Sequence, residues 1–174
     1  IFGDGKYQLK VWTKDEAGNI CEDTWQEEFK VDTTAPELEN LYLTTADVDG
    51  AVGILAQDQN SLVYRYIYQN AVNIQISFNC DISGQSKIEY QFTSSFAYDN
   101  AKWNEYNAKT GLTVNPNKKF ILAVHATDQA GNQTIVYSDG IIVDNEAPVG
   151  EGLAPEITIT PDSPNANGYH NGDV

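Results

Sequence analysis

Aspartate is the residue type in this chain best suited to chemistry, because its carboxylate can bind a cation or transfer a proton. Asp32, Asp81 and Asp128 each stand in a short polar segment between apolar runs. Carboxylate oxygens are preferred ligands of Ca²⁺, so these three are candidate calcium ligands if the fold brings them together. In the alternative interpretation, Asp81 and Asp128 accept hydrogen bonds from the backbone of their own turns, and Asp32 is solvated.

No group of residues favours catalysis. His125 and His170 are the only histidines, and the strand pattern around His125 places it on a solvent-facing side. The 25 Asp and Glu residues are spread along the chain, so no pair stands out as a glycosidase dyad. No phosphate-binding loop, serine-nucleophile motif or zinc-protease motif occurs. We therefore expect a protein that is not an enzyme and has no cofactor other than the calcium considered above.

Aromatic residues suggest a second kind of site. Tyr64, Tyr66 and Tyr68 recur with period two and therefore share one face of a strand, and Trp103 is a further candidate. The apolar faces of such rings can stack on sugars, so these four residues are candidate glycan-binding residues. Packing in the core, or in an aromatic ladder across strands, is the alternative.

Charge excludes some partners. The chain carries 25 acidic against 10 basic residues, a formal charge of −15, which argues against nucleic acid and anionic membranes as partners. No apolar run approaches the roughly 18 residues of a membrane span, so direct membrane insertion is not expected.

A duplicated hairpin organises the chain. Residues 120–127 alternate between two faces as a strand does, a turn follows from Asp128 to Asn132, and a second apolar run at 134–143 ends before Pro148. The same succession occurs in residues 6–36, with a turn from Asp15 to Asn19 and a proline at 36. Two copies of one hairpin predict a repeat protein.

The residues between the two hairpins also predict strands. Alternating apolar residues indicate strands at 39–45, 62–78 and 87–93, and shorter ones at 103–106 and 112–114. Residues 46–61 are rich in Asp, Gly, Gln and Asn, which predicts a loop. Several short strands without any helical period are typical of an all-β sandwich.

At this point the sequence resembles a known family. Tyr7-x-Leu9-x-Val11, followed by Asp-x-Ala-Gly-Asn at 15–19 and Val-Asp-Thr-Thr-Ala-Pro at 31–36, looks like the tandem immunoglobulin-like repeats of large bacterial surface and secreted proteins. The resemblance implies an Ig-like β-sandwich in a tandem repeat fragment. Residues 1–35 would be the last hairpin of one repeat, 36–148 a complete domain and 149–174 the first strand or strands of the next.

The resemblance also implies a role. Such repeats serve mostly as extracellular spacers, stalks or adhesin modules, whose partners are adjacent repeats and a host or cell-wall glycan or protein. The alternative is a carbohydrate-binding module of an extracellular glycan-active protein. Pro36 and Pro148 restrict the chain before them to extended geometry, which favours stiff linkers and a rod.

An Ig-type sandwich would also place the proposed calcium ligands together. The start of its first strand and two of its loops share one pole, and these segments carry Asp32, Asp81 and Asp128. The same resemblance predicts that the Tyr7 hydroxyl bonds to nearby backbone, a bond that Phe120 at the matching position lacks.

Overall fold

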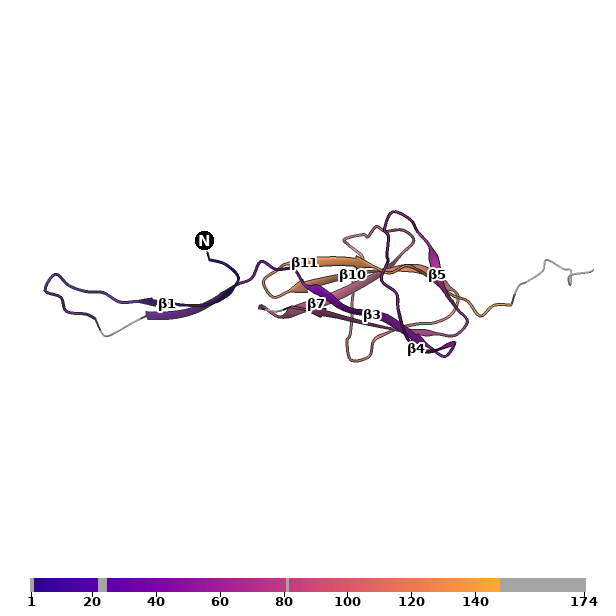
Figure 1. The fold of residues 1–174 in the computed structure, drawn as a ribbon, viewed down its shortest axis with the longest axis horizontal. Coiled ribbons are helices and arrows are strands. Elements are labelled where there is room, and N and C mark those ends of the chain that lie inside the picture. Colours follow the sequence, from indigo (N-terminus) through magenta and orange to yellow (C-terminus); the bar gives the residue numbers. More distant parts are fainter. Residues whose placement is uncertain (1, 22–24, 81, 148–174) are drawn as a thin grey trace, which may run out of the picture.

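The computed structural model describes residues 2–21, 25–80 and 82–147. Within these residues the chain is all-β, as predicted, and contains no helix. Its strands form a two-stranded, a four-stranded and a six-stranded sheet. The two larger sheets make up a body, residues 37–143, that we call the two-sheet body. The two-stranded hairpin projects from one end of this body, so the molecule is elongated (Figure 1).

The projecting hairpin consists of β1 (Gly5–Val11) and β2 (Trp25–Val31), which pair antiparallel. Tyr7 lies opposite Phe29, and their rings stack with centroids 5.4 Å apart. The Tyr7 hydroxyl donates a hydrogen bond to the Gly3 carbonyl at 2.6 Å, which confirms the predicted bond to nearby backbone.

The four-stranded sheet has the order β4-β3-β6-β9. Its strands are β4 (Val48–Gly53), β3 (Glu37–Thr45), β6 (Val72–Asn79) and β9 (Leu112–Val114). The prediction of a loop over residues 46–61 is wrong for β4, which pairs antiparallel with β3. Val52 of β4 packs against the core, although residues 46–61 as a whole are rich in Asp, Gly, Gln and Asn.

The six-stranded sheet has the order β5-β12-β10-β7-β8, and β11 also pairs with β10. Its strands are β5 (Tyr64–Tyr68), β12 (Gly140–Val143), β10 (Lys118–Asp128), β7 (Gln85–Thr93), β8 (Asn104–Glu105) and β11 (Gln133–Tyr137). All pairs are antiparallel except β5 with β12.

The predicted single strand over 134–143 is divided at Ser138 and Asp139 into β11 and β12. At this break a distant segment takes over the backbone hydrogen bonds. The Asp139 amide donates to Ile54 O and the Ala56 amide donates to Tyr137 O, both at 2.9 Å.

One apolar core lies between the two larger sheets. It combines inward side chains of both, among them the fully buried Leu43 and Ile74 of one sheet and Leu122 and Ile141 of the other. Burying such side chains is the main stabilising contribution to this fold.

A smaller cluster lies on the outer face of β10. Ile121 and Ala123 are fully buried there because Phe96 and Trp103, from the connection between β7 and β8, pack over them. His125, expected on a solvent face, therefore has a side chain only 12% exposed.

Candidate functional site: the linker junction

The β10–β11 turn is built by one aspartate and one asparagine. Asp128 Oδ1 accepts the Asn132 amide and Asp128 Oδ2 accepts Asn132 Nδ2, both at 2.9 Å. Gly131 has φ +94°, a left-handed conformation that glycine adopts without steric cost. The prediction that Asp128 accepts hydrogen bonds from its own turn is confirmed.

The same turn holds the linker that enters the two-sheet body. Asn132 Nδ2 also donates to the Asp32 carbonyl at 3.0 Å, and Thr134 Oγ1 donates to the Pro36 carbonyl at 2.5 Å. Asp32 Oδ2 accepts the Ser83 amide at 2.9 Å from the β6–β7 loop. The β6–β7 loop and the β10–β11 turn thus hold the Asp32 end of the linker, and Thr134 of β11 holds its Pro36 end.

The hairpin holds the linker from the other side. One carboxylate oxygen of Asp4 accepts the amide and the hydroxyl of Thr33 at 3.0 and 2.8 Å, and its other oxygen accepts the Thr34 hydroxyl at 2.6 Å. Asp32 Oδ1 accepts the Thr34 amide at 3.1 Å and fixes the linker's own turn. We call this set of contacts around residues 32–36 the linker junction.

The turn of the first hairpin has the same geometry as the second. Asp15 Oδ1 accepts the Asn19 amide at 2.7 Å, Asp15 Oδ2 accepts Asn19 Nδ2 at 2.6 Å, and Gly18 also has φ +94°. The linker turn is duplicated too, since Asp144 Oδ1 accepts the Glu146 amide at 2.9 Å as Asp32 does with Thr34. The sequence repeat is therefore a structural repeat.

Hydrogen bonds favour the ionised form of Asp4 and Asp128 at the linker junction and of Asp15 in the hairpin turn. Hydrogen bonds from Thr34 and Thr33 lower the pKa of Asp4, and hydrogen bonds from Asn19 lower that of Asp15. Burial acts to raise the pKa of Asp128, but the hydrogen bonds from Asn132 and the turn backbone outweigh it, and the pKa lies below its usual value.

The proposed calcium ligands meet this junction in part. The segments of Asp32 and Asp128 lie together through Asn132, whereas Asp81 lies outside the described residues. Both carboxylate oxygens of Asp32 and both of Asp128 accept N–H donors. Within the described part of the chain, no three His, Cys, Asp or Glu residues are grouped as a metal site. The calcium site stays a prediction.

The proposed glycan-binding residues are not gathered on one surface. Tyr68 is buried in the core. Tyr66 packs against the core, and its hydroxyl donates a hydrogen bond to the Gly53 carbonyl at 2.7 Å. Tyr64 is partly buried, with Lys119 Nζ 4.2 Å from its ring centre. Trp103 precedes β8, at the opposite edge of the sheet from β5. This arrangement favours the packing alternative for the tyrosines.

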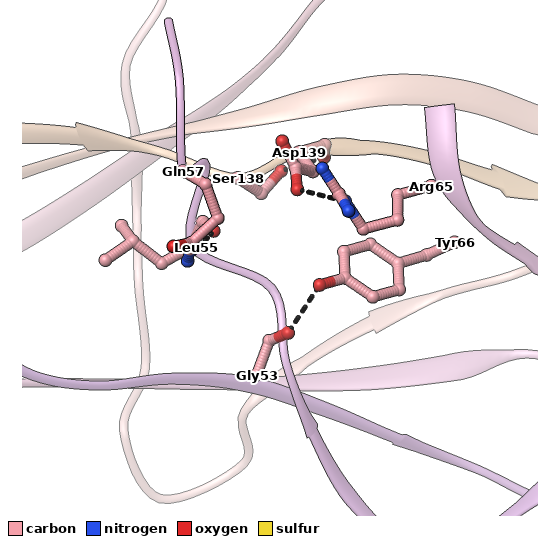
Figure 2. A network of polar contacts seen from close by, with 7 residues as sticks. All are labelled: Gly53, Leu55, Gln57, Arg65, Tyr66, Ser138 and Asp139. Carbon is pink, nitrogen blue, oxygen red and sulfur yellow. Dashed lines mark hydrogen bonds and ion pairs between the residues drawn. The ribbon is translucent and has the colours of Figure 1, made fainter. Parts of the chain in front are cut away.

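A polar network that the sequence analysis missed lies beside β5. Arg65 Nε donates to Asp139 Oδ2 at 2.8 Å, and the Asp139 side chain is only 3% exposed (Figure 2). Ser138 Oγ accepts the Leu122 amide and donates to the Asp139 carbonyl. The sequence signal that could have pointed to this network is Arg65, because it is the only arginine in the chain.

Comparison with known proteins assigns no family. Neither the models of protein families nor the curated proteins include a match to this chain. Among the described residues, the fold has no helix of the length and apolarity needed to span a membrane.

Proposed function

We propose that the chain is part of a tandem array of Ig-like β-sandwich repeats, and that it acts as a non-catalytic spacer, stalk or adhesin module. The strand order supports the Ig-like assignment. An Ig sandwich has strands A, B and E in one sheet and strands C, F and G in the other. The four-stranded sheet contains β3, β6 and β9, which correspond in chain order to A, B and E, and the six-stranded sheet contains β7, β10 and β12, which correspond to C, F and G.

The linker junction carries the proposal. Residues 32–36 are held by Asp4 of the hairpin and by Ser83, Asn132 and Thr134 of the two-sheet body. A linker bound on both sides cannot turn freely, so successive units keep one orientation. Pro36 adds stiffness because its ring fixes φ. Such a junction suits a protein that holds one part at a distance from another.

Charge and duplication support the same role. Turns and linkers with matching hydrogen bonds recur 112 to 113 positions apart, as an array of similar units requires. A net charge of −15 makes neighbouring arrays repel one another and stay soluble. In this proposal the parent protein is bacterial and lies outside the cell, at its surface or secreted. Its partners are adjacent repeats and a host or cell-wall glycan or protein.

The glycan-binding alternative has weaker support. A sugar-stacking surface needs two or three exposed rings, whereas Tyr68 is 8% exposed and Tyr66 is anchored to Gly53. The calcium prediction is compatible with the spacer role, because an ion at the same pole would stiffen the junction further.

Residual dipolar couplings measured by NMR test the spacer proposal. Couplings from β1 and β2 and couplings from the two-sheet body should fit a single alignment tensor. Two different tensors, with weaker alignment of the hairpin, would show a free joint and contradict the proposal.

A glycan array tests the carbohydrate-binding alternative. We expect no glycan to bind, and binding that is lost in Tyr64→Ala would favour the carbohydrate module instead.

A further inference from the structure

Strand β5 is an open edge of the six-stranded sheet. It stands at the end of the strand order and, within the described residues, pairs only with β12. Soluble proteins usually protect such edges with lysine or proline, because the unpaired backbone groups can bind another strand. β5 reads Tyr-Arg-Tyr-Ile-Tyr and has neither.

The outward side chains of this edge form a short row of apolar, cationic and apolar residues. Val63, just before β5, is 42% exposed and Ile67 is 68% exposed, while the side chain of Arg65 between them is 53% exposed. Ile142 of β12, partly exposed, lies beside Ile67 in the ladder. Exposed apolar side chains gathered around a cation are typical of interaction sites.

Arg65 is held in place before any partner arrives. Its Nε is bound to Asp139, which is buried, and the Asp139 amide is itself bound to Ile54 O (Figure 2). The other guanidinium N–H groups make no hydrogen bond to any residue that the structure describes. A guanidinium fork of this kind matches a carboxylate, and because it is already ordered, binding costs less side-chain entropy.

We propose that β5 binds an extended protein segment whose carboxylate lies between two apolar side chains, each two residues away. The segment adds to the sheet as a further strand. Its carboxylate contacts Arg65, and its apolar side chains cover Val63 and Ile67. Arg65, the only arginine of the chain, identifies the partner's carboxylate, because its guanidinium N–H groups other than Nε–H make no hydrogen bond to the described residues and match a carboxylate in geometry. This adds recognition of a protein partner to the spacer role and does not depend on that role.

A second copy of this chain is a poorer occupant. An antiparallel pair of β5 strands that sets Val63 against Ile67 also sets the two Arg65 side chains against each other, and like charges directly opposite are destabilising. Two copies that each carry −15 also repel.

The test is an NMR titration of the isotope-labelled protein with an end-blocked synthetic peptide, Ser-Thr-Val-Thr-Asp-Thr-Ile-Thr-Ser. We expect shifts confined to β5 and β12, with a Kd between about 0.1 and 1 mM, as suits a small interface. The matching peptide with Asn in place of Asp should bind at least about fivefold more weakly, because the charged hydrogen bonds to Arg65 are lost.

Protein variants provide the controls. Arg65→Lys keeps a cation for Asp139 but removes the fork, and Ile67→Thr keeps a β-forming residue but removes apolar surface. Both should weaken binding at least about threefold. Val48→Thr, a similarly exposed valine on the edge strand β4 of the other sheet, should bind like the unmodified protein.

The proposal is overturned by absence of shifts at millimolar peptide, by equal binding of the Asp and Asn peptides, or by shifts centred outside β5 and β12. Self-association through β5, detected by sedimentation at rising concentration, would also overturn it.

Discussion

Replacing Thr134 by valine isolates one contact of the linker junction. The two side chains have nearly the same shape, and both favour strands, so β11 should be retained. The change removes the hydroxyl that donates to the Pro36 carbonyl at 2.5 Å, and Pro36 is buried. A net hydrogen bond contributes about 0.5–1.5 kcal/mol, and an acceptor left unsatisfied costs up to about 3 kcal/mol.

We therefore expect Thr134→Val to lower the free energy of unfolding by about 1–2 kcal/mol. For a folded unit of this size each kcal/mol shifts Tm by about 4 °C, so Tm should fall by about 4–8 °C in a calorimetric scan. Thr44→Val is the matched control, because Thr44 is exposed on β3 and its side chain makes no hydrogen bond to the described residues. If Thr134→Val melts like Thr44→Val, the linker bond contributes nothing and the reasoning is wrong.

Three further predictions concern charge, packing and calcium. Folding lowers the pKa of Asp128, so ionised Asp128 stabilises the fold fully above the usual pKa of 3.8, and this stabilisation is lost as the pH falls through the lower folded value. In a series of Tm measurements from pH 7 to 2, Tm should therefore decrease once the pH is below about 4. The decrease should be less steep in Asp128→Asn. Gly140→Ala should destabilise the fold by about 1–3 kcal/mol in urea unfolding, because the added Cβ would lie 2.9 Å from the backbone Cα of Tyr64. Gly53→Ala is the control and should be nearly neutral, because no atom lies within 4 Å of its new Cβ. Equal effects of the two substitutions would refute the close packing of Gly140 against Tyr64. If calcium binds as predicted, millimolar calcium raises Tm, and the rise is absent in Asp32→Asn; an unchanged Tm in the unmodified protein would remove the site.

Local rules predict much of this fold from the sequence. Period-two alternation gives β9 at Leu112–Val114 and most of β10, because one face of each strand is buried in the core. The Asp-x-Ala-Gly-Asn turns are predictable as well, since they are closed by residues within five positions and by a glycine with positive φ. Features that depend on near neighbours in the chain are the ones that sequence patterns reveal.

The missed features depend on residues far apart in the chain. Asp139 interrupts the last strand because its amide bonds to Ile54 and its carboxylate to Arg65, 74 positions away. Period two places His125 on the outer face correctly, but it gives no sign that Trp103 will cover that face, with ring centroids 5.2 Å apart. Pairings of this kind are set by tertiary packing and not by local pattern.

The candidate site divides in the same way. The resemblance to Ig-type sandwiches implies that the segments of Asp32 and Asp128 meet, and Asn132 joins them. For the carboxylates, a calcium ion and the turn bonds of Asp128 with a solvated Asp32 are the two alternatives. Asn132 donates to Asp128 as the second alternative predicts, but Asp32 is not simply solvated, because its oxygens accept the Thr34 and Ser83 amides. A carboxylate in a turn accepts either kind of partner, and only the positions of the surrounding backbone amides distinguish them.

The distance distribution between the hairpin and the two-sheet body tests the central claim most directly. Spin labels at Lys10→Cys and Lys109→Cys, both exposed positions, report it by pulsed electron paramagnetic resonance once both native cysteines are replaced by serine. A stiff junction predicts one narrow distribution, which broadens in the double variant Asn132→Ala and Thr134→Val. A broad distribution in the otherwise unmodified chain, or one that is equally narrow in the double variant, would contradict a linker held by these contacts.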